Sequence, residues 1–348
     1  MKHSANRSTW STGSSVRSRL QETALNSTNR TATKMWQFGL KLAVSIALLA
    51  LLLSRTDLQA LATLFRSLRF PIFFGSVLLY LLVQLLSTIR WRCLLQAEQI
   101  HLPFWRLILL YYEGMFFNLM LPTAIGGDVV RGYRVSRLTE RREASLASIL
   151  VERLSGFVAM AIIACIAVVP AYAHLSDPLI MWLTAGSAVG MVVLVASLLS
   201  DRLQALFFRL LHGVGLGRFH ETLHRLYEAV QQYWAHRATL LLALGLSLVL
   251  QSLVITIFYL ISQALNLSVP FHYFFLFVPL MSVISMVPIS IAGLGLREGS
   301  AVYLFTKVGL DAAGAISLSL LWFVVTALCS GLGGIVFLVG PSEHRIDT

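Results

Sequence analysis

Two segments far apart in the chain each carry an arginine shortly after a proline and a glycine turn. Residues 121–131 read Leu-Pro-Thr-Ala-Ile-Gly-Gly-Asp-Val-Val-Arg, and residues 287–297 read Val-Pro-Ile-Ser-Ile-Ala-Gly-Leu-Gly-Leu-Arg. They align without a gap, so that Arg131 corresponds to Arg297. A guanidinium donates charge-assisted hydrogen bonds to a carboxylate or a phosphate. The repeated pattern therefore indicates the binding of an anionic group.

Both segments interrupt apolar stretches. Pro122 corresponds to Pro288, and Gly127 to Gly293. Inside a bilayer, backbone broken in this way is tolerated only where it is buried in protein or lines a wet cavity. Two such breaks in corresponding halves are typical of the binding site of repeat-built transporters. The alternative is that each arginine marks the cytoplasmic end of an ordinary span, since Pro and Gly are common in membrane helices.

The elements that must hold these residues are membrane helices. The chain has 57% hydrophobic residues, only 12% charged residues and a mean hydropathy of +0.76, whereas soluble domains carry about 25% charged residues. About 20 apolar residues cross the hydrocarbon core, so we expect an all-α, polytopic membrane protein with seven or eight crossings, the irregular region 107–130 included. The predicted spans are 35–53, 70–89, 154–173, 178–200, two within 238–296, and 312–340.

The net charge of +11 reflects membrane topology rather than nucleic-acid binding. Lys and Arg gather in short segments, whereas 174–177 and 266–272 contain none. This positive-inside pattern predicts a multi-pass protein of the inner (plasma) membrane with a cytoplasmic N-terminus. Basic residues on both sides of 107–130 predict that this region is a re-entrant hairpin, which would invert one copy of the repeated segment; four intervening spans would leave both copies in one orientation. The basic segments are 1–34, 90–106, 131–142 and 201–237.

One domain is expected. Residues 1–34 form a disordered basic tail, residues 35–340 a single transmembrane domain, and residues 341–348 a short tail. Within the domain, 201–237 is predicted to form two amphipathic helices at the cytoplasmic surface, separated by glycines. No stretch is long enough for a soluble catalytic domain. No cofactor is expected, and no ATP-binding motif is present.

One motif favours a different chemistry. His220-Glu221-Thr-Leu-His224 has the spacing that places two zinc-binding imidazoles on one helix face, with the Glu as general base. Against this, the motif lies in the polar linker, Arg225 follows the second His, and no downstream motif offers a third ligand. An intramembrane zinc metalloprotease remains an alternative, as does an integral-membrane lipid or glycan transferase or its non-catalytic partner.

Four motifs, in this order, resemble the signature of the transmembrane flippase-like domain family of lysylphosphatidylglycerol synthases. They are Asn118-Leu-Met-Leu-Pro122, Gly126-Gly127-Asp128-Val-Val-Arg131, Ala147-Ser148-Ile-Leu-Val-Glu152-Arg153 and Gly293-Leu-Gly295-Leu-Arg297-Glu298. The resemblance covers roughly residues 36–340. It implies movement of a lipid, or a lipid-linked head group, between leaflets. It does not imply aminoacyl transfer, which in fused relatives belongs to a separate soluble domain, so we expect no enzyme activity.

The expected mechanism places Arg131 and Arg297 around an anionic phosphate in a polar cavity. Asp128, Glu152 and Glu298 would balance their charge when the site is empty, or meet a cationic head group. Arg153 would either contact the substrate or pair with its neighbour Glu152. The expected lipid is an anionic or aminoacylated phospholipid or a polyprenyl-linked lipid; a lipid synthase or a second copy of the chain is a further candidate partner. The expected substrate-binding residues are Glu113, Asn118, Pro122, Gly126, Gly127, Asp128, Arg131, Glu152, Arg153, Pro288, Gly293, Gly295, Arg297 and Glu298.

Overall fold

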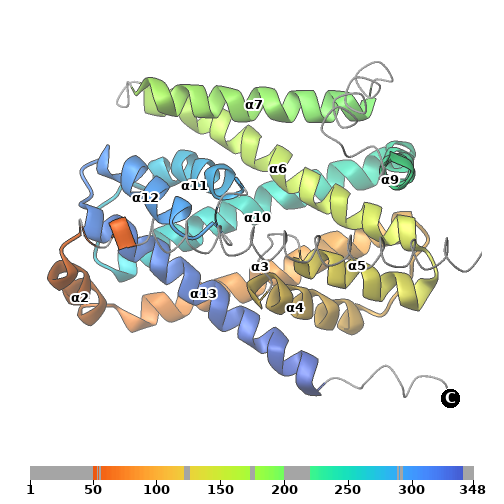
Figure 1. Ribbon diagram of the computed structural model, residues 1–348, viewed down its shortest axis with the longest axis horizontal. Helices are drawn as coiled ribbons and strands as arrows, with labels where there is room; N and C mark the ends of the chain where they lie inside the picture. The colour runs from red at the N-terminus through yellow and green to blue at the C-terminus, as the bar shows by residue number, and fades with distance from the viewer. Residues whose placement is uncertain are drawn as a thin grey trace, which may run out of the picture.

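The protein is a bundle of helices in the computed structural model, which describes residues 50–52, 54, 56–120, 126–172, 177–199, 220–287, 290 and 293–339. These residues contain no strand (Figure 1). The helices are α2 (Leu58–Arg66), α3 (Phe70–Ala97), α4 (Phe104–Met120), α5 (Gly126–Thr139), α6 (Arg142–Tyr172), α7 (Pro178–Leu199), α9 (His220–Gln232), the 3-10 turn η2 (Tyr233–His236), α10 (Arg237–Ala264), α11 (Phe271–Ser285), α12 (Leu296–Thr306) and α13 (Ala312–Val339).

Four of the described helices are long and apolar enough to cross a membrane, namely α3, α6, α10 and α13. Each has 28 residues or more, and at about 1.5 Å per residue this exceeds a hydrocarbon core of about 30 Å. α7 and α11 contain shorter apolar helices. The all-helical, polytopic class is therefore confirmed. The predicted span 35–53 falls almost entirely outside the described residues, and the number of crossings stays a prediction.

The antiparallel helices α3 and α10 pack along each other and define two opposite ends of the bundle. At one end the start of α3 lies against the end of α10, because the Arg69 amide donates to the Ala264 carbonyl oxygen at 2.9 Å. At the other end the Tyr233 hydroxyl donates to the Leu94 carbonyl oxygen at 3.0 Å, which brings η2 and the start of α10 beside the end of α3. The chain between 238 and 296 folds back after α10, as its length required.

Two short helical hairpins enter the bundle from these opposite ends (Figure 1). α4 and α5 follow the end of α3 and precede the start of α6, whereas α11 and α12 follow the end of α10 and precede the start of α13. The first repeated segment lies where α4 gives way to α5, and the second where α11 gives way to α12. The two copies are therefore inverted with respect to each other. This arrangement decides between the two orientations that the sequence had left open.

α9 lies where the second of the two linker helices was predicted, and its location at the cytoplasmic surface stays a prediction. It packs against α6 and contributes the buried residues Tyr227, Ala229 and Val230. The first predicted linker helix, around residues 203–210, lies outside the described residues. The tails 1–34 and 341–348 also lie outside them.

Asp177 ties the start of α7 to the outer end of α12. Its carboxylate accepts a hydrogen bond from the Tyr303 hydroxyl at 3.0 Å and pairs with the Lys307 ammonium at 2.8 Å. The Leu179 amide donates to the same carboxylate at 2.9 Å. The hydrogen bond from Lys307 lowers the pKa of Asp177 to about 2.

This contact predicts a pH dependence of stability. A carboxyl group whose pKa is lowered by folding stabilises the fold above its unfolded pKa of about 3.9 and loses that contribution as the pH falls through its folded pKa. We expect Asp177→Asn to lower the thermal midpoint by a constant, small amount from about pH 5 to pH 8, with the difference closing towards about pH 2. Thermal unfolding in detergent checks this, with exposed Glu143→Gln as control. A difference that persists unchanged in acid would contradict it.

Candidate functional site

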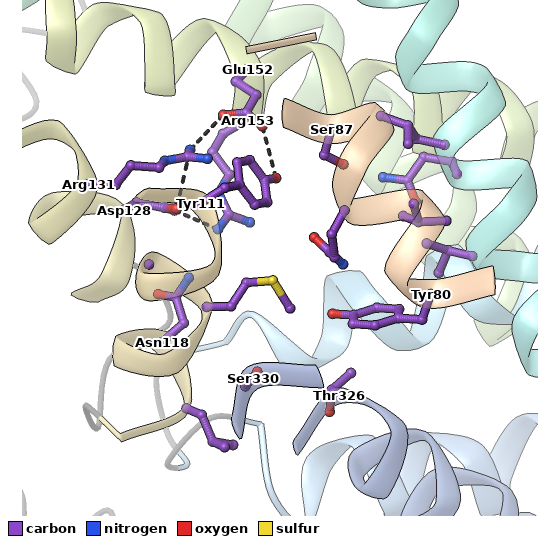
Figure 2. Close-up of a pocket in the computed structure, with 18 of the residues that line it drawn as sticks. Tyr80, Ser87, Tyr111, Asn118, Asp128, Arg131, Glu152, Arg153, Thr326 and Ser330 are labelled. Carbon is purple, nitrogen blue, oxygen red and sulfur yellow. Dashed lines mark hydrogen bonds and ion pairs between the residues drawn. The ribbon is translucent and has the colours of Figure 1, made fainter. Parts of the chain in front are cut away.

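A polar cavity of about 410 Å³ lies inside the bundle, between α3, α4, α5, α6, α10, α12 and α13. Its lining includes the arginines that follow both repeated segments, Arg131 from α5 and Arg297 from α12. Figure 2 shows a charged cluster along one side, with Tyr80, Ser87 and Thr326 across the space from it. The two interrupted segments therefore contribute to one cavity.

Arg131 is the most enclosed arginine of the cavity. Its side chain is 3% exposed and donates to Glu152 Oε2 at 2.6 Å. The guanidinium carbon lies 4.3 Å from the centre of the Trp91 ring and 4.5 Å from that of Tyr111. Attraction to the faces of aromatic rings stabilises a desolvated guanidinium. The charge of Arg131 is thus held by protein groups on three sides.

Glu152, on α6, is the hub of the charged cluster. Besides Arg131, it accepts hydrogen bonds from Arg90 at 3.0 Å and from the Tyr111 hydroxyl at 3.1 Å. Arg90 is held in turn by Ser247, whose Oγ lies 2.7 Å from Nη1. A buried charge is tolerated when it is paired and its remaining hydrogen-bonding capacity is satisfied. The cluster joins α3, α4, α5, α6 and α10.

Arg153 does not pair with its chain neighbour Glu152, which was one of the two roles expected for it. Its Nε donates to Asp128 Oδ2 at 2.7 Å. Adjacent residues on an α-helix point about 100° apart, so Glu152 and Arg153 meet different residues of α5: Glu152 pairs with Arg131, and Arg153 with Asp128 one turn earlier. The Arg153 side chain is 43% exposed. It is therefore the arginine of the charged cluster that is most open to a ligand.

The second repeated segment builds a similar but smaller unit. Arg297 donates to Glu298 Oε1 at 2.7 Å and to Ser319 Oγ at 2.9 Å. Glu298 is fully buried, and its other oxygen accepts the Gly295 amide at 2.7 Å. Gly293 and Gly295 have φ of +75° and +85°, a region that glycine enters at little cost. The glycine turn thus sets where α12 begins and aims Arg297 at the cavity.

The expected site residues fall into three groups. Six line the cavity, and six others belong to the helices and turns around it. Of these six, Glu113 pairs with Arg134 at 2.7 Å, and Gly126 and Gly127 begin α5. The other three, Gly293, Gly295 and Glu298, belong to the glycine turn at the start of α12. Pro122 and Pro288 lie outside the described residues. The six that line the cavity are Asn118, Asp128, Arg131, Glu152, Arg153 and Arg297.

Several charged or polar lining residues were missed from the sequence, and Arg90 and Tyr111 are the two that join the charged cluster. Arg90 was counted in the basic segment 90–106 outside the predicted span, but it lies within α3 and is 8% exposed. Tyr111 was not singled out. The signal for Arg90 was available, because Gln84 and Ser87 precede it at helical spacing in an otherwise apolar span. A polar stripe of this kind must face the protein interior rather than lipid.

The zinc alternative is not tested by this geometry. α9 begins at His220, but the side chains of His220, Glu221 and His224 lie outside the described residues. Among the side chains that the structure does describe, no group of three or more His, Cys, Asp and Glu could hold a metal ion.

Comparison with known families adds one finding. The family model described as "Lysylphosphatidylglycerol synthase TM region" matches residues 39–334. The match spans both repeated segments and every residue that lines the cavity. No curated protein and no solved structure matches the chain.

Proposed function

Since the chain belongs to the family of the lysylphosphatidylglycerol synthase TM region, we propose that it moves a lipid, or a lipid-linked head group, between the leaflets of the inner membrane. The substrate is a phospholipid or a polyprenyl-linked lipid, and the protein carries out no covalent chemistry on it. This proposal rests on the membrane class of the fold, the family and the geometry of the cavity.

One observation carries the proposal: arginines from two inverted, interrupted hairpins line the same cavity. A head group that crosses the bilayer must exchange water for other polar partners, because an unpaired charge or polar group in hydrocarbon is costly. The cavity offers such partners inside a bundle of membrane-length helices. The acyl chains would stay outside in the lipid, alongside the apolar surfaces of the helices.

The opposed hairpins suggest how access could alternate. In transporters built from inverted repeats, one repeat moves against the other around a central site. Here α4–α5 and α11–α12 enter from opposite ends of the long helices. Displacement of either hairpin would open the cavity towards its own side. The sequence has no ATP-binding motif, so transport would be downhill, coupled to an ion or driven by a partner.

A reconstituted transport assay tests the proposal. Proteoliposomes that carry a fluorescent phospholipid are treated with an external quencher, and the rate at which inner-leaflet lipid becomes accessible is measured. We expect Arg297→Gln to lower this rate at least about tenfold, which corresponds to about 1.4 kcal/mol of lost interaction, since Arg297 lines the cavity. Arg297→Lys, which keeps the charge beside buried Glu298, should retain part of the rate.

Arg237→Gln is the matched control, because Arg237 is exposed at the start of α10 and does not line the cavity. It should transport at the wild-type rate. Equal rates in wild type, Arg297→Gln and protein-free vesicles would sink the proposal. Zinc analysis of the same purified protein separates it from the metalloprotease alternative.

A further inference from the structure

We propose that the cavity selects a head group with net negative charge, bound through its phosphate, and discriminates against cationic aminoacyl head groups. This inference rests on the proposed function and names its substrate class. The first argument is the charge of the lining. Four arginines line the cavity against two carboxylates, Asp128 and Glu152. When the neighbouring Glu298, which pairs with Arg297, is included, the cluster still carries one excess positive charge.

The second argument is that both lining carboxylates are already occupied by arginines. Glu152 accepts from Arg90 and Arg131 through its two different oxygens. Asp128 pairs with Arg153 through Oδ2 and lies 3.6 Å from Arg131 through Oδ1. An ammonium group would have to displace one of these arginines to gain a carboxylate partner. The cost of leaving that arginine unpaired opposes a cationic head group.

The aromatic rings of the cluster offer no better place for an ammonium. Rings that could bind a cation through their faces include Trp91 and Tyr111, but Arg131 already lies over both, at 4.3 and 4.5 Å from the ring centres. Across the cavity, Arg297 lies over the Phe323 ring at 5.7 Å from its centre, and Phe258 covers one face of the Trp322 ring at 4.4 Å. Three of the aromatic rings in or beside the cavity thus already have an arginine as their cation.

The third argument is that donors remain for an anion. Arg153 is 43% exposed and Arg297 12% exposed, and both line the cavity. Within the described part of the chain, the Nε atoms of buried Arg90 and Arg131 have no hydrogen-bond partner. A guanidinium prefers the oxygens of a phosphate as acceptors. We assign direct contact with the phosphate to Arg153 and Arg297, and assign Arg90 and Arg131 to the support of Glu152.

The remaining lining suits an uncharged, hydroxyl-bearing part of the head group. Gln84, Gln251, Thr326 and Ser330 line the cavity and can each donate and accept hydrogen bonds. A volume of about 410 Å³ lies within the range of small-ligand sites. The cavity therefore fits a glycerophosphate-like or sugar-phosphate group more readily than a bare ion.

Transport of three lipids tests this selectivity. Full-length protein is reconstituted in phosphatidylcholine vesicles that contain traces of labelled phosphatidylglycerol, phosphatidylcholine or lysylphosphatidylglycerol, which are anionic, zwitterionic and cationic. We expect the anionic lipid to move at least about tenfold faster than the other two. Arg153→Gln should remove this preference, whereas Arg142→Gln, which changes an exposed arginine on the same helix, should keep it.

A charge-switch variant keeps the test decisive if Arg153→Gln fails to fold. Gln251→Glu adds a carboxylate to the cavity wall with almost no change in volume and leaves every arginine in place. It should shift the ratio of anionic to cationic transport towards the cationic lipid by several fold. An unchanged ratio in this variant would contradict the inference.

The outcomes separate the inference from the proposed function. Equal or faster movement of the cationic lipid overturns the inference and leaves lipid transport standing. If no lipid moves, the proposed function fails, and native mass spectrometry of the protein with phosphatidylglycerol or inorganic phosphate then decides the site. Preferential retention of the anionic lipid would support the inference, whereas inorganic phosphate binding as tightly as the lipid would assign the cavity to a free anion and overturn it.

Discussion

Replacement of Glu152 by glutamine is expected to lower the free energy of unfolding by about 3–5 kcal/mol, the usual cost of removing one partner from a buried ion pair. Glu152 is 2% exposed and pairs with both Arg90 and Arg131. Without its charge, two buried guanidinium groups lose their principal acceptor. Because Arg131 also lies against the Trp91 and Tyr111 rings and its side chain is 3% exposed, it cannot reach water without rearrangement of α4. Denaturation in mixed micelles and the yield of folded protein measure the effect.

The control for this variant is Glu143→Gln, which neutralises an exposed glutamate on the same helix. Substitutions at such sites usually change stability by no more than about 0.5 kcal/mol. We expect this variant to unfold with the wild type. A Glu152→Gln protein as stable as the control would show that the two arginines do not depend on the Glu152 carboxylate for their stabilisation. The selectivity argument would then lose its premise that the lining carboxylates are occupied.

Replacement of Gly127 by alanine should separate α4 from α5 and abolish transport. A Cβ at Gly127 would overlap the carbonyl oxygen of Gly114 and press on the backbone amide of Asn118. Backbone cannot yield as a flexible side chain can, so the cost should reach or exceed the about 1–3 kcal/mol typical of overpacking. The hydrogen bond from the Gly127 amide to Asn118 Oδ1, at 2.8 Å, would break. Asp128 and Arg131 follow on the same helix and would move with it.

Gly190→Ala is the matched control, since a Cβ there would meet no atom within 4 Å. It should be neutral or stabilise α7 by up to about 1 kcal/mol through its higher helix propensity. Thermal stability and lipid transport are measured for both variants in parallel. Wild-type transport by Gly127→Ala would mean that transport tolerates a wider separation of α4 and α5. The close contact between Gly127 and Gly114 would then not be what fixes the position of Arg131.

The charged cluster and the two hairpins depend on the same residue types, namely paired arginines and closely packed glycines. Arginines within a bilayer are costly unless they are paired, and here each is paired with a carboxylate from another helix or from its own turn. The glycines permit the close helix contacts and the positive φ angles on which these pairs depend. Function and folding therefore depend on the same few positions. Because the Arg153 side chain is 43% exposed, variants of Arg153 are best suited to separate an effect on transport from an effect on folding.

The sequence by itself determined the class of the protein and the position of its breaks. Hydropathy is a local property of the chain, so the apolar stretches 70–89, 154–173 and 312–340 predicted the helices α3, α6 and α13. The ends of α4 at Met120 and of α11 at Ser285 lie next to the repeated segments, where Pro and Gly had indicated interruptions. The repeat also predicted that Arg131 and Arg297 face one polar cavity, and both residues line the same cavity in the structure.

Only the tertiary structure decided which charges meet and how the two repeated segments are oriented. Arg90 and Glu152 are 62 positions apart, and their contact depends on the rotation of α3 and α6 about their axes as well as on their packing. The same rotation sends Arg153 to Asp128 rather than to Glu152. The inversion of the hairpins depends on whether each short helix pair crosses the bundle or turns back within it. Local sequence patterns do not encode these long-range relations, because they arise from the way distant helices fit together.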